Sequence, residues 1–202
     1  GKLYGPDHTL SGKYTFLNKA QEDDIVIRHW INDKGVEIAK DRKVSCIITQ
    51  DPQDDTIKTA QKLDISLIVT DYIEYATAYA LNCASRMYAS DAYKISITGT
   101  NGKTTICYLV YQLLTLLGKK CAYIGTIGFY YGNTKRLLNN TTPDTDLLYD
   151  MLLEAKEYGC EYVVMEVSSH ALKLGRVNTL KFDYAILTNI TEDHLDFHKT
   201  YK

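Results

Sequence analysis

The chain has 202 residues, a formal net charge of −2 and 45% hydrophobic residues. This length gives room for one large domain or two small domains with a buried core. The charge provides no basic field, so we expect no nucleic-acid partner. The five cysteines have neither metal-ligand nor disulfide-framework spacing, which is typical of a reduced, cytoplasmic protein. No apolar run approaches the roughly 18 residues that span a bilayer, so we expect no membrane insertion.

The first 90 residues are predicted to form a small α/β unit. Short apolar runs predict its strands, and amphipathic stretches predict its helices. The acidic and histidine side chains of this unit are interpreted as solvated surface. The expected strands are 44–49 and 65–70, the expected helices are 31–39, 54–63 and 71–88, and residues 89–92 are a candidate linker.

A phosphate-binding turn is the strongest signal in the chain. A β-branched strand leads into Gly99-Thr100-Asn101-Gly102, and a helix begins with Lys103-Thr104-Thr105. The two glycines let successive N–H groups point inward at the positive end of the helix, where a triphosphate can sit. Lys103 would supply a mobile cation, and Thr104 would offer a hydroxyl to magnesium. Ile97 stands where the full Walker pattern has glycine, so an ordinary strand-to-helix turn is the alternative.

Two helices are predicted in the second half of the chain. The first follows the turn and ends at Gly118; the second is capped by Thr142, has Pro143 in its first turn and ends at Gly159. A strand is expected at 121–127, followed by a polar segment as far as Asn140. The apolar face is expected to contain Ile106, Leu109, Val110, Leu113, Leu114 and Leu117 in the first helix, and Leu147, Leu148, Met151, Leu152 and Ala155 in the second.

Two more predicted strands end in polar residues. The strand 161–166 ends in Glu166, and because ligands gather at the carboxyl ends of parallel strands, Glu166 is expected beside the phosphate-binding turn. A carboxylate there can bind magnesium next to Thr104. The strand 182–187 leads into carboxylates and imidazoles at 192–198, which could hold a second metal or orient a substrate. A hydrolase based on Ser169 and His170 is disfavoured, because no nucleophile elbow is present.

From residue 94 to the end, the motifs and their spacing resemble those of the Mur ligases, and most closely the branch that adds the third residue of the peptidoglycan peptide. These motifs are, in chain order, Gly99-Thr100-Asn101-Gly102-Lys103-Thr104-Thr105, Asn140-Thr141-Thr142-Pro143-Asp144, Glu166-Val167-Ser168-Ser169-His170-Ala171-Leu172, Arg176-Val177, Phe182-Asp183, Thr188-Asn189 and Asp193-His194-Leu195-Asp196-Phe197-His198.

The resemblance implies an ATP-dependent amide ligase. ATP would phosphorylate the terminal carboxylate of UDP-N-acetylmuramoyl-L-alanyl-D-glutamate, and the amino group of an amino acid would displace phosphate from the acyl phosphate. The residues that family analogy places at the site are Gly99, Thr100, Asn101, Gly102, Lys103, Thr104 and Thr105 for ATP, Thr104 and Glu166 for a first Mg2+, His194 for a second Mg2+, Asn140, Thr141, Thr142, Ser168 and Arg176 for the muramoyl-peptide, and Lys103, Glu166 and His194 for catalysis.

The chain departs from the family pattern in two ways. Phe16-Leu17-Asn18 stands where that branch has an Asp-Ser-Arg string that holds uridine, and Lys43-Val44 replaces a Gly-Ala turn, so uridine binding by this unit stays an open question. The chain also stops within the family's central domain, before a lysine that becomes carbamylated and before the domain that selects the amino acid. We therefore expect a fragment that is inactive alone.

These observations predict an α/β protein with a small α/β amino-terminal domain at 1–90, and the first part of a P-loop-type central domain at 91–202 with a mostly parallel sheet flanked by helices. The expected partners are ATP, Mg2+, the UDP-muramoyl-dipeptide and an amino acid of unspecified identity, and a monomer is expected. The alternatives are a Mur-like nucleotide-binding module or regulator without ligase activity, and a P-loop phosphohydrolase. Folylpolyglutamate synthases have a related loop, but the strings around Thr142 and Ser168 favour a muramoyl substrate.

Overall fold

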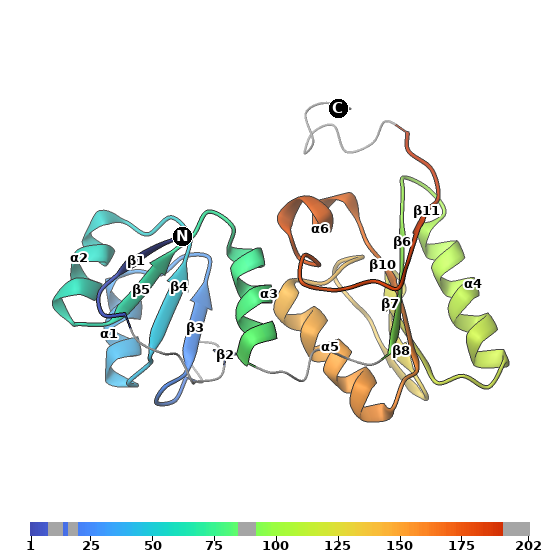
Figure 1. Cartoon of the computed structure of the whole chain (residues 1–202), viewed down its shortest axis with the longest axis horizontal. Coiled ribbons are helices and arrows are strands. Elements are labelled where there is room, and N and C mark those ends of the chain that lie inside the picture. Colours follow the sequence, from blue (N-terminus) through green and yellow to red (C-terminus); the bar gives the residue numbers. More distant parts are fainter. Residues whose placement is uncertain (8–13, 16–19, 85–91, 192–202) are drawn as a thin grey trace. The chain divides into compact units, whose positions relative to one another are not determined.

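The computed structural model describes residues 1–7, 14–15, 20–84 and 92–191. Two units, Gly1–Arg86 and Met87–Lys202, each have their own sheet and helices (Figure 1). Both units are α/β with mostly parallel sheets, which confirms the predicted fold class. The candidate linker falls almost wholly on residues outside the described ranges. Among the described residues, no helix is both long and apolar enough to cross a membrane.

The first unit is a five-stranded sheet in the order β1-β5-β4-β3-β2, in which β2 to β5 run parallel and β1 pairs antiparallel with β5. The strands near 44–49 and 65–70, and the helices near 31–39 and 54–63, are confirmed, whereas β1 to β3 were not among the predicted strands. The bounds are β1 Lys2–Tyr4, β2 Tyr14–Thr15, β3 Ile25–Arg28, α1 Asp33–Asp41, β4 Cys46–Thr49, α2 Asp54–Lys62, β5 Ser66–Val69 and α3 Ile73–Ala84.

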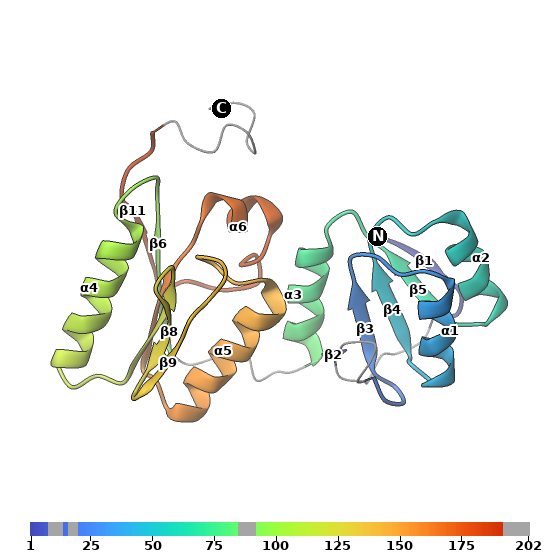
Figure 2. The ribbon, with the colours of Figure 1, turned by 180° about the vertical axis from the view of Figure 1, so that it is seen from behind.

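Strand alternation divides the core of this unit between the two faces of its sheet. Val26 and Ile47 lie in the cluster that contains Val36 of α1 and Ala60 of α2. Their neighbours along the strands point the opposite way, into the cluster that contains Ile73 of α3. A strand whose successive residues are all apolar can therefore be buried on both faces, as in other parallel sheets. Figure 2 shows α1 and α2 on one side of this sheet and α3 on the other.

The second unit contains a six-stranded sheet in the order β11-β6-β10-β7-β8-β9. The strands β11, β6, β10 and β7 are parallel, and β8 and β9 extend the sheet as an antiparallel meander. The helix α4 lies on one face, and α5 and α6 lie on the other (Figure 1). The bounds are β6 Tyr93–Thr98, α4 Lys103–Leu116, β7 Cys121–Gly125, β8 Gly128–Tyr131, β9 Thr134–Arg136, α5 Thr145–Tyr158, β10 Tyr162–Glu166, α6 Ser169–Leu174 and β11 Tyr184–Leu187.

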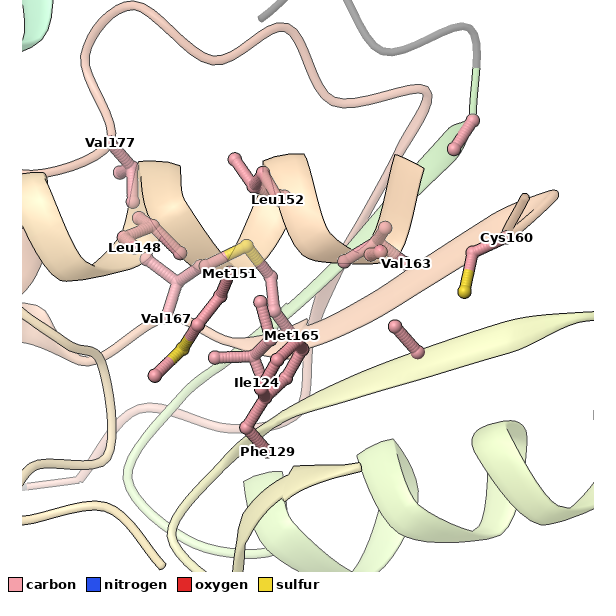
Figure 3. Packing of buried hydrophobic residues seen from close by; sticks show 13 residues of the cluster. Ile124, Phe129, Leu148, Met151, Leu152, Cys160, Val163, Met165, Val167 and Val177 are labelled. Atoms are coloured by element: carbon pink, nitrogen blue, oxygen red, sulfur yellow. The ribbon is translucent and has the colours of Figure 1, made fainter. Parts of the chain in front are cut away.

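The main core of the second unit lies between α5 and the sheet. Leu148, Met151 and Leu152 of α5 pack against Val163 and Met165 of β10 (Figure 3). All five side chains are buried. This packing fixes the position of β10, and therefore the position of the carboxylate at its end.

The segment expected to be polar as far as Asn140 contains two strands that were not predicted, β8 and β9. Gly125 pairs with Gly128 across a two-residue turn, and Gly128 has a φ of 135°, which favours glycine. The chain then turns again at Gly132, which has a φ of 51°. Phe129 of β8 enters the core. Strands of four and three residues are too short to show a clear period-two pattern, so both were missed.

Several leucines predicted to be buried are exposed. Leu147 in α5 is on the solvent side, and so are Leu109, Leu113 and Leu117 in or just after α4. The half-buried Ile106, Val110 and Leu114 are the residues of that prediction that pack on the sheet. The helical period was therefore assigned correctly, but too many of the apolar residues on these helices were predicted to be buried.

Candidate functional site

The phosphate-binding turn joins β6 to α4. Gly99 follows the strand with a φ of 132°, and Gly102 is the residue before the first turn of α4, with a φ of 84°. Both conformations favour glycine, because a Cβ atom would strain the backbone. The N–H groups of Lys103, Thr104 and Thr105 lie in the first turn of the helix, where the helix offers them no acceptor. They are the backbone donors best placed for an anion at the positive end of the helix.

The segment after β11 holds this turn from the side. The Asn189 side chain forms a two-way bond with Asn101, since Oδ1 accepts from the Asn101 N–H at 3.0 Å and Nδ2 donates to the Asn101 carbonyl at 3.0 Å. The Thr188 hydroxyl donates to the same carbonyl at 2.6 Å, and the Thr100 N–H donates to the Asn189 carbonyl at 2.9 Å. The N–H groups of Thr100 and Asn101 are therefore used to shape the turn. Sequence reasoning gave Asn189 no role, although it stands at the end of a predicted strand.

The ammonium group of Lys103 folds back over the turn. Its Nζ donates to the carbonyl of Gly99 at 2.7 Å and to the carbonyl of Thr100 at 3.0 Å. Both acceptors are neutral, so the positive charge of Lys103 stays available to an anion at the mouth of the turn.

Glu166, at the end of β10, lies beside the turn, as the strand order predicts. Its side chain is fully buried. Oε2 accepts from the Thr104 hydroxyl at 2.8 Å and from the Thr126 hydroxyl at 3.2 Å. Oε1 accepts from the Tyr123 hydroxyl at 2.6 Å and from the Thr126 N–H at 2.9 Å. Burial first, and then the bond to Glu166, raise the pKa of Tyr123, which keeps it a donor at physiological pH.

The surroundings of this carboxylate suit magnesium. All four donors to Glu166 are neutral, and no cationic side chain of the described residues forms an ion pair with it. Buried charges in proteins are normally paired or bound to metals. Mg2+ is commonly bound by one or two protein oxygens together with substrate phosphates, and the hydroxyl of Thr104 and the carboxylate of Glu166 fit that pattern. Within the described ranges no group of three or more His, Cys, Asp or Glu residues could hold a metal by itself.

The segment before α5 lies against the other side of the end of β10. The Thr142 hydroxyl donates to the carbonyl of Glu166 at 3.0 Å and accepts from the N–H of Ser168 at 2.9 Å. The expectation that Thr142 caps the helix was therefore wrong. Asp144 occupies the capping position, because α5 begins at Thr145. Ser168 instead caps α6, by accepting from the N–H of Ala171.

Arg176, two residues after the end of α6, holds the same segment. Its Nη1 donates to the carbonyl of Thr142 at 3.0 Å, and its Nη2 pairs with Asp144 Oδ1 at 2.7 Å. Its Nε is buried and has no hydrogen-bond partner among the residues that the structure describes. Thr141 is linked to the phosphate side through a hydroxyl contact of 3.0 Å with Thr126. The structure thus brings the candidate residues 141, 142, 168 and 176 to the end of β10, next to Glu166.

Some predicted site residues lie outside the described part of the chain. These are His194 and the acidic cluster after residue 191, together with positions 16–18, where the uridine string would align. Asn140 is exposed just before Thr141. The structure therefore describes three parts of the predicted site, which are the phosphate-binding turn, Glu166, and the residues near the start of α5 and around α6.

We expect Gly99→Ala to weaken nucleotide binding and to lower the free energy of unfolding by about 1–3 kcal/mol, because an L residue is strained at this φ. The new Cβ would also lie 2.8 Å from the carbonyl oxygen of Asn189, which shapes the turn. Gly118→Ala is the matched control, since Gly118 also has a positive φ but has no atom within 4 Å of the place that a Cβ would take. Urea unfolding and nucleotide titration of both variants check this. Equal nucleotide affinity in both would contradict it.

We expect Thr142→Val to lower the free energy of unfolding by about 1–3 kcal/mol. Valine has the same shape as threonine but lacks the buried hydroxyl and its two hydrogen bonds. Thr141→Val removes a hydroxyl one residue away that is less buried, and it should change this free energy by less than about 0.5 kcal/mol. Chemical denaturation of the two variants measures the difference. Equal losses would mean that Thr142 has no special structural role.

Comparisons with known proteins agree with this geometry. The Mur ligase middle domain matches residues 97–202. A UDP-N-acetylmuramoyl-L-alanyl-D-glutamate–L-lysine ligase of Staphylococcus epidermidis is 40% identical over 137 residues, which make up 66% of this chain and 27% of the relative. A UDP-N-acetylmuramoyl-L-alanyl-D-glutamate–2,6-diaminopimelate ligase of Clostridium perfringens is 47% identical over 108 residues, 54% of this chain and 22% of the relative. The chain thus spans about a quarter of the length of these curated relatives.

The fold also matches a solved structure. A UDP-N-acetylmuramoyl-L-alanyl-D-glutamate–2,6-diaminopimelate ligase superposes with a TM-score of 0.70 over 92% of this chain and 37% of that chain, at 23% identity. At 23% identity, this similarity shows that the two proteins share a fold.

Proposed function

The chain belongs to the Mur ligase family, and we propose that it supplies the nucleotide-binding part of an ATP-dependent ligase that adds one amino acid to UDP-N-acetylmuramoyl-L-alanyl-D-glutamate. The names of the two curated relatives support this acceptor, because both contain it. They differ in the amino acid, L-lysine in one and 2,6-diaminopimelate in the other, so the proposal leaves the amino acid open.

The single observation that carries the proposal is the 2.8 Å bond between the Thr104 hydroxyl and Glu166. It joins the first turn of α4, which offers N–H donors for phosphate, to a buried carboxylate that lacks a cationic partner among the described residues. A turn with only a structural role would have no need for a buried, unneutralised carboxylate at this place. In contrast, a magnesium nucleotide needs both groups together.

We assign the residues as follows. The N–H groups of the first turn of α4 and the ammonium of Lys103 would hold the ATP phosphates. Thr104 and Glu166 would hold a first Mg2+, and His194 a second one. Magnesium, when bound, neutralises charge on the phosphates and on the reacting oxygens. Asn140, Thr141 and Thr142 on the segment before α5, together with Ser168 and Arg176 on either side of α6, would contact the muramoyl-peptide.

The proposed reaction has two steps. A carboxylate oxygen of the glutamate attacks the γ-phosphorus of ATP, the bond to the bridging oxygen breaks, and ADP leaves. The amine of the amino acid then attacks the acyl carbon, and phosphate leaves with the former carboxylate oxygen, while the amine loses a proton. Lys103 and the helix N–H groups would stabilise the negative charge that develops on the transferred phosphoryl group. The transfer itself needs no protein nucleophile.

We also propose that the two units correspond to an amino-terminal domain of Mur ligase type, at 1–90, and to the first part of the ATP-binding central domain, at 91–202. The amino acid would be selected by residues outside this chain. The cytoplasm is the proposed location, because both ATP and nucleotide-linked precursors are expected there. We propose a monomer as the working unit.

The test is ADP release by the protein expressed from the complete reading frame to which this sequence belongs, with Mg2+-ATP, UDP-muramoyl-dipeptide and single amino acids supplied in turn. The proposal predicts release that requires both the dipeptide and one amino acid. ATP turnover without an amino acid would favour a phosphohydrolase instead. Nucleotide binding without turnover under any combination would favour a binding module or regulator.

A further inference from the structure

Tyr123 belongs to the site but had no role in the predictions from sequence. It lies on β7, its side chain is fully buried, and its hydroxyl donates to Glu166 Oε1 at 2.6 Å. This distance is at the short end for a bond from a hydroxyl to a carboxylate, as expected for a charge-assisted bond. Of the four groups that donate hydrogen bonds to this carboxylate, the Tyr123 hydroxyl is thus the closest.

The two oxygens of Glu166 are held by different kinds of donor. Oε1 receives the Tyr123 O–H, whose oxygen is held in place by a packed ring, and the Thr126 N–H, which is held in place by the backbone. Oε2 receives the hydroxyls of Thr104 and Thr126, which can turn about their C–O bonds and present a lone pair instead. A carboxylate oxygen accepts about two hydrogen bonds, so Oε1 is filled by fixed donors, while Oε2 can exchange its donors for a cation.

On the basis of the proposed function, we propose that Tyr123 is a positioning residue that fixes Oε1 of Glu166 and thereby directs Oε2 to the magnesium ion. The residue does not touch the metal or the nucleotide. It acts through Glu166, as the hydrogen-bond partners of other metal ligands do.

The surroundings of Tyr123 keep its hydroxyl in one place. Its ring packs against the rings of Tyr108, Tyr111 and Tyr130 at centroid distances of 5.6, 6.0 and 5.7 Å. Gly125 lies against the other end of the hydrogen bond, where a Cβ atom would collide with both Glu166 Oε1 and the Tyr123 hydroxyl. The ring cluster therefore fixes the position of the hydroxyl oxygen, and glycine at 125 leaves the space that its bond to Oε1 needs.

The test is Tyr123→Phe, which removes the hydroxyl and keeps the ring. Tyr108→Phe is the matched control, because it removes a hydroxyl from the same ring cluster at a residue that does not bond to Glu166. The readouts are Mn2+ binding by electron paramagnetic resonance in the presence of ADP, and ADP affinity without metal. We expect Tyr123→Phe to weaken Mn2+ binding about 10–100-fold, with metal-free ADP affinity unchanged, and Tyr108→Phe to bind as the parent protein does.

The outcomes separate this proposal from the proposed function. If the parent protein shows no metal-dependent ADP binding, the proposed function fails. If the parent protein binds metal and Tyr123→Phe binds it equally well, the role of Tyr123 is refuted and the proposed function stands. An equal loss in Tyr108→Phe and Tyr123→Phe would also refute the role, since it would trace the effect to ring packing.

A second measurement needs no variant. With 13C at the ring carbon that bears the hydroxyl of Tyr123, the NMR shift reports on the hydrogen bond. The proposal predicts that this shift stays nearly constant when Mg2+ and ADP are added, because Oε1 keeps its donor. A large shift on metal binding would mean that the hydroxyl leaves Oε1, and that result would overturn the proposal even if Tyr123→Phe does not fold.

Discussion

Lys103→Met, in the protein expressed from the complete reading frame, should reduce acceptor-dependent ADP release by about 10²–10³-fold, the usual cost of removing one preorganised group that stabilises developing charge. In the structure the Lys103 ammonium lies over the turn, 2.7 Å from the carbonyl of Gly99 and 3.0 Å from that of Thr100. Methionine keeps an unbranched side chain as far as the ε carbon and lacks the ammonium group, with its charge and its donors. The free energy of unfolding should fall by about 1.5–3 kcal/mol, because the lost bonds run from one charged, half-buried ammonium group to two carbonyls.

Lys119→Met is the control for a lost lysine charge. Lys119 follows the other end of α4 and pairs with Glu161 at 3.0 Å, away from the phosphate turn. Steady-state kinetics of the two variants should show normal turnover for Lys119→Met. If Lys103→Met retains full turnover and full ATP affinity, the phosphate turn does not hold ATP in the way we propose.

Glu166→Gln should have an effect of similar size, at least about 10²-fold on turnover, through the loss of metal binding. The amide oxygen can replace Oε1 and still accept from the hydroxyl of Tyr123 and the N–H of Thr126. The amide nitrogen then takes the place of Oε2, where the hydroxyls of Thr104 and Thr126 can turn and accept from it. The fold is thus preserved, but a neutral donor faces the place where a cation would bind.

Glu161→Gln is the matched control for the same chemical change on an exposed carboxylate. ADP titration at increasing Mg2+ concentrations compares the two variants. We expect the Mg2+ dependence to disappear in Glu166→Gln and to remain in Glu161→Gln. Unchanged Mg2+ dependence in Glu166→Gln would remove Glu166 from the metal site.

The parts of the fold that the sequence predicted are those that local patterns determine. The β-branched run before Gly99 and the glycine at 102 predicted a strand, a turn and a helix, all of which are confirmed as β6 and α4. The position of Glu166 beside the turn followed from topology alone, because parallel strands end at the same edge of a sheet. Gly159 was likewise predicted as the end of α5, and it caps that helix with a φ of 83°.

The parts that the sequence did not predict depend on partners that are distant in the chain. Thr142 has the local signature of a helix cap, yet its hydroxyl bonds to Glu166 and Ser168, 24 and 26 residues away. Asn189 shapes the phosphate turn from 88 residues away. The stripe of leucines on α4 has a helical period, but period alone does not say how wide a stripe the sheet covers.

The same limit applies to the candidate site. The phosphate turn and Glu166 could be found from residue type and order. The roles of Tyr123 and Thr126 could not, because a tyrosine and a threonine near the end of a strand are ordinary core and turn residues by sequence. Only the packed structure shows that both bond to the buried carboxylate.

The most direct test of the proposed ligase is the fate of the carboxylate oxygens of its acceptor. UDP-muramoyl-dipeptide labelled with 18O in the terminal glutamate carboxylate is incubated with the protein, Mg2+-ATP and the amino acid that supports ADP release, and the phosphate released is analysed by mass spectrometry. The acyl-phosphate route predicts one 18O atom from the acceptor in each phosphate. Phosphate that carries oxygen from water, and none from the acceptor, would contradict it and would identify ATP hydrolysis instead.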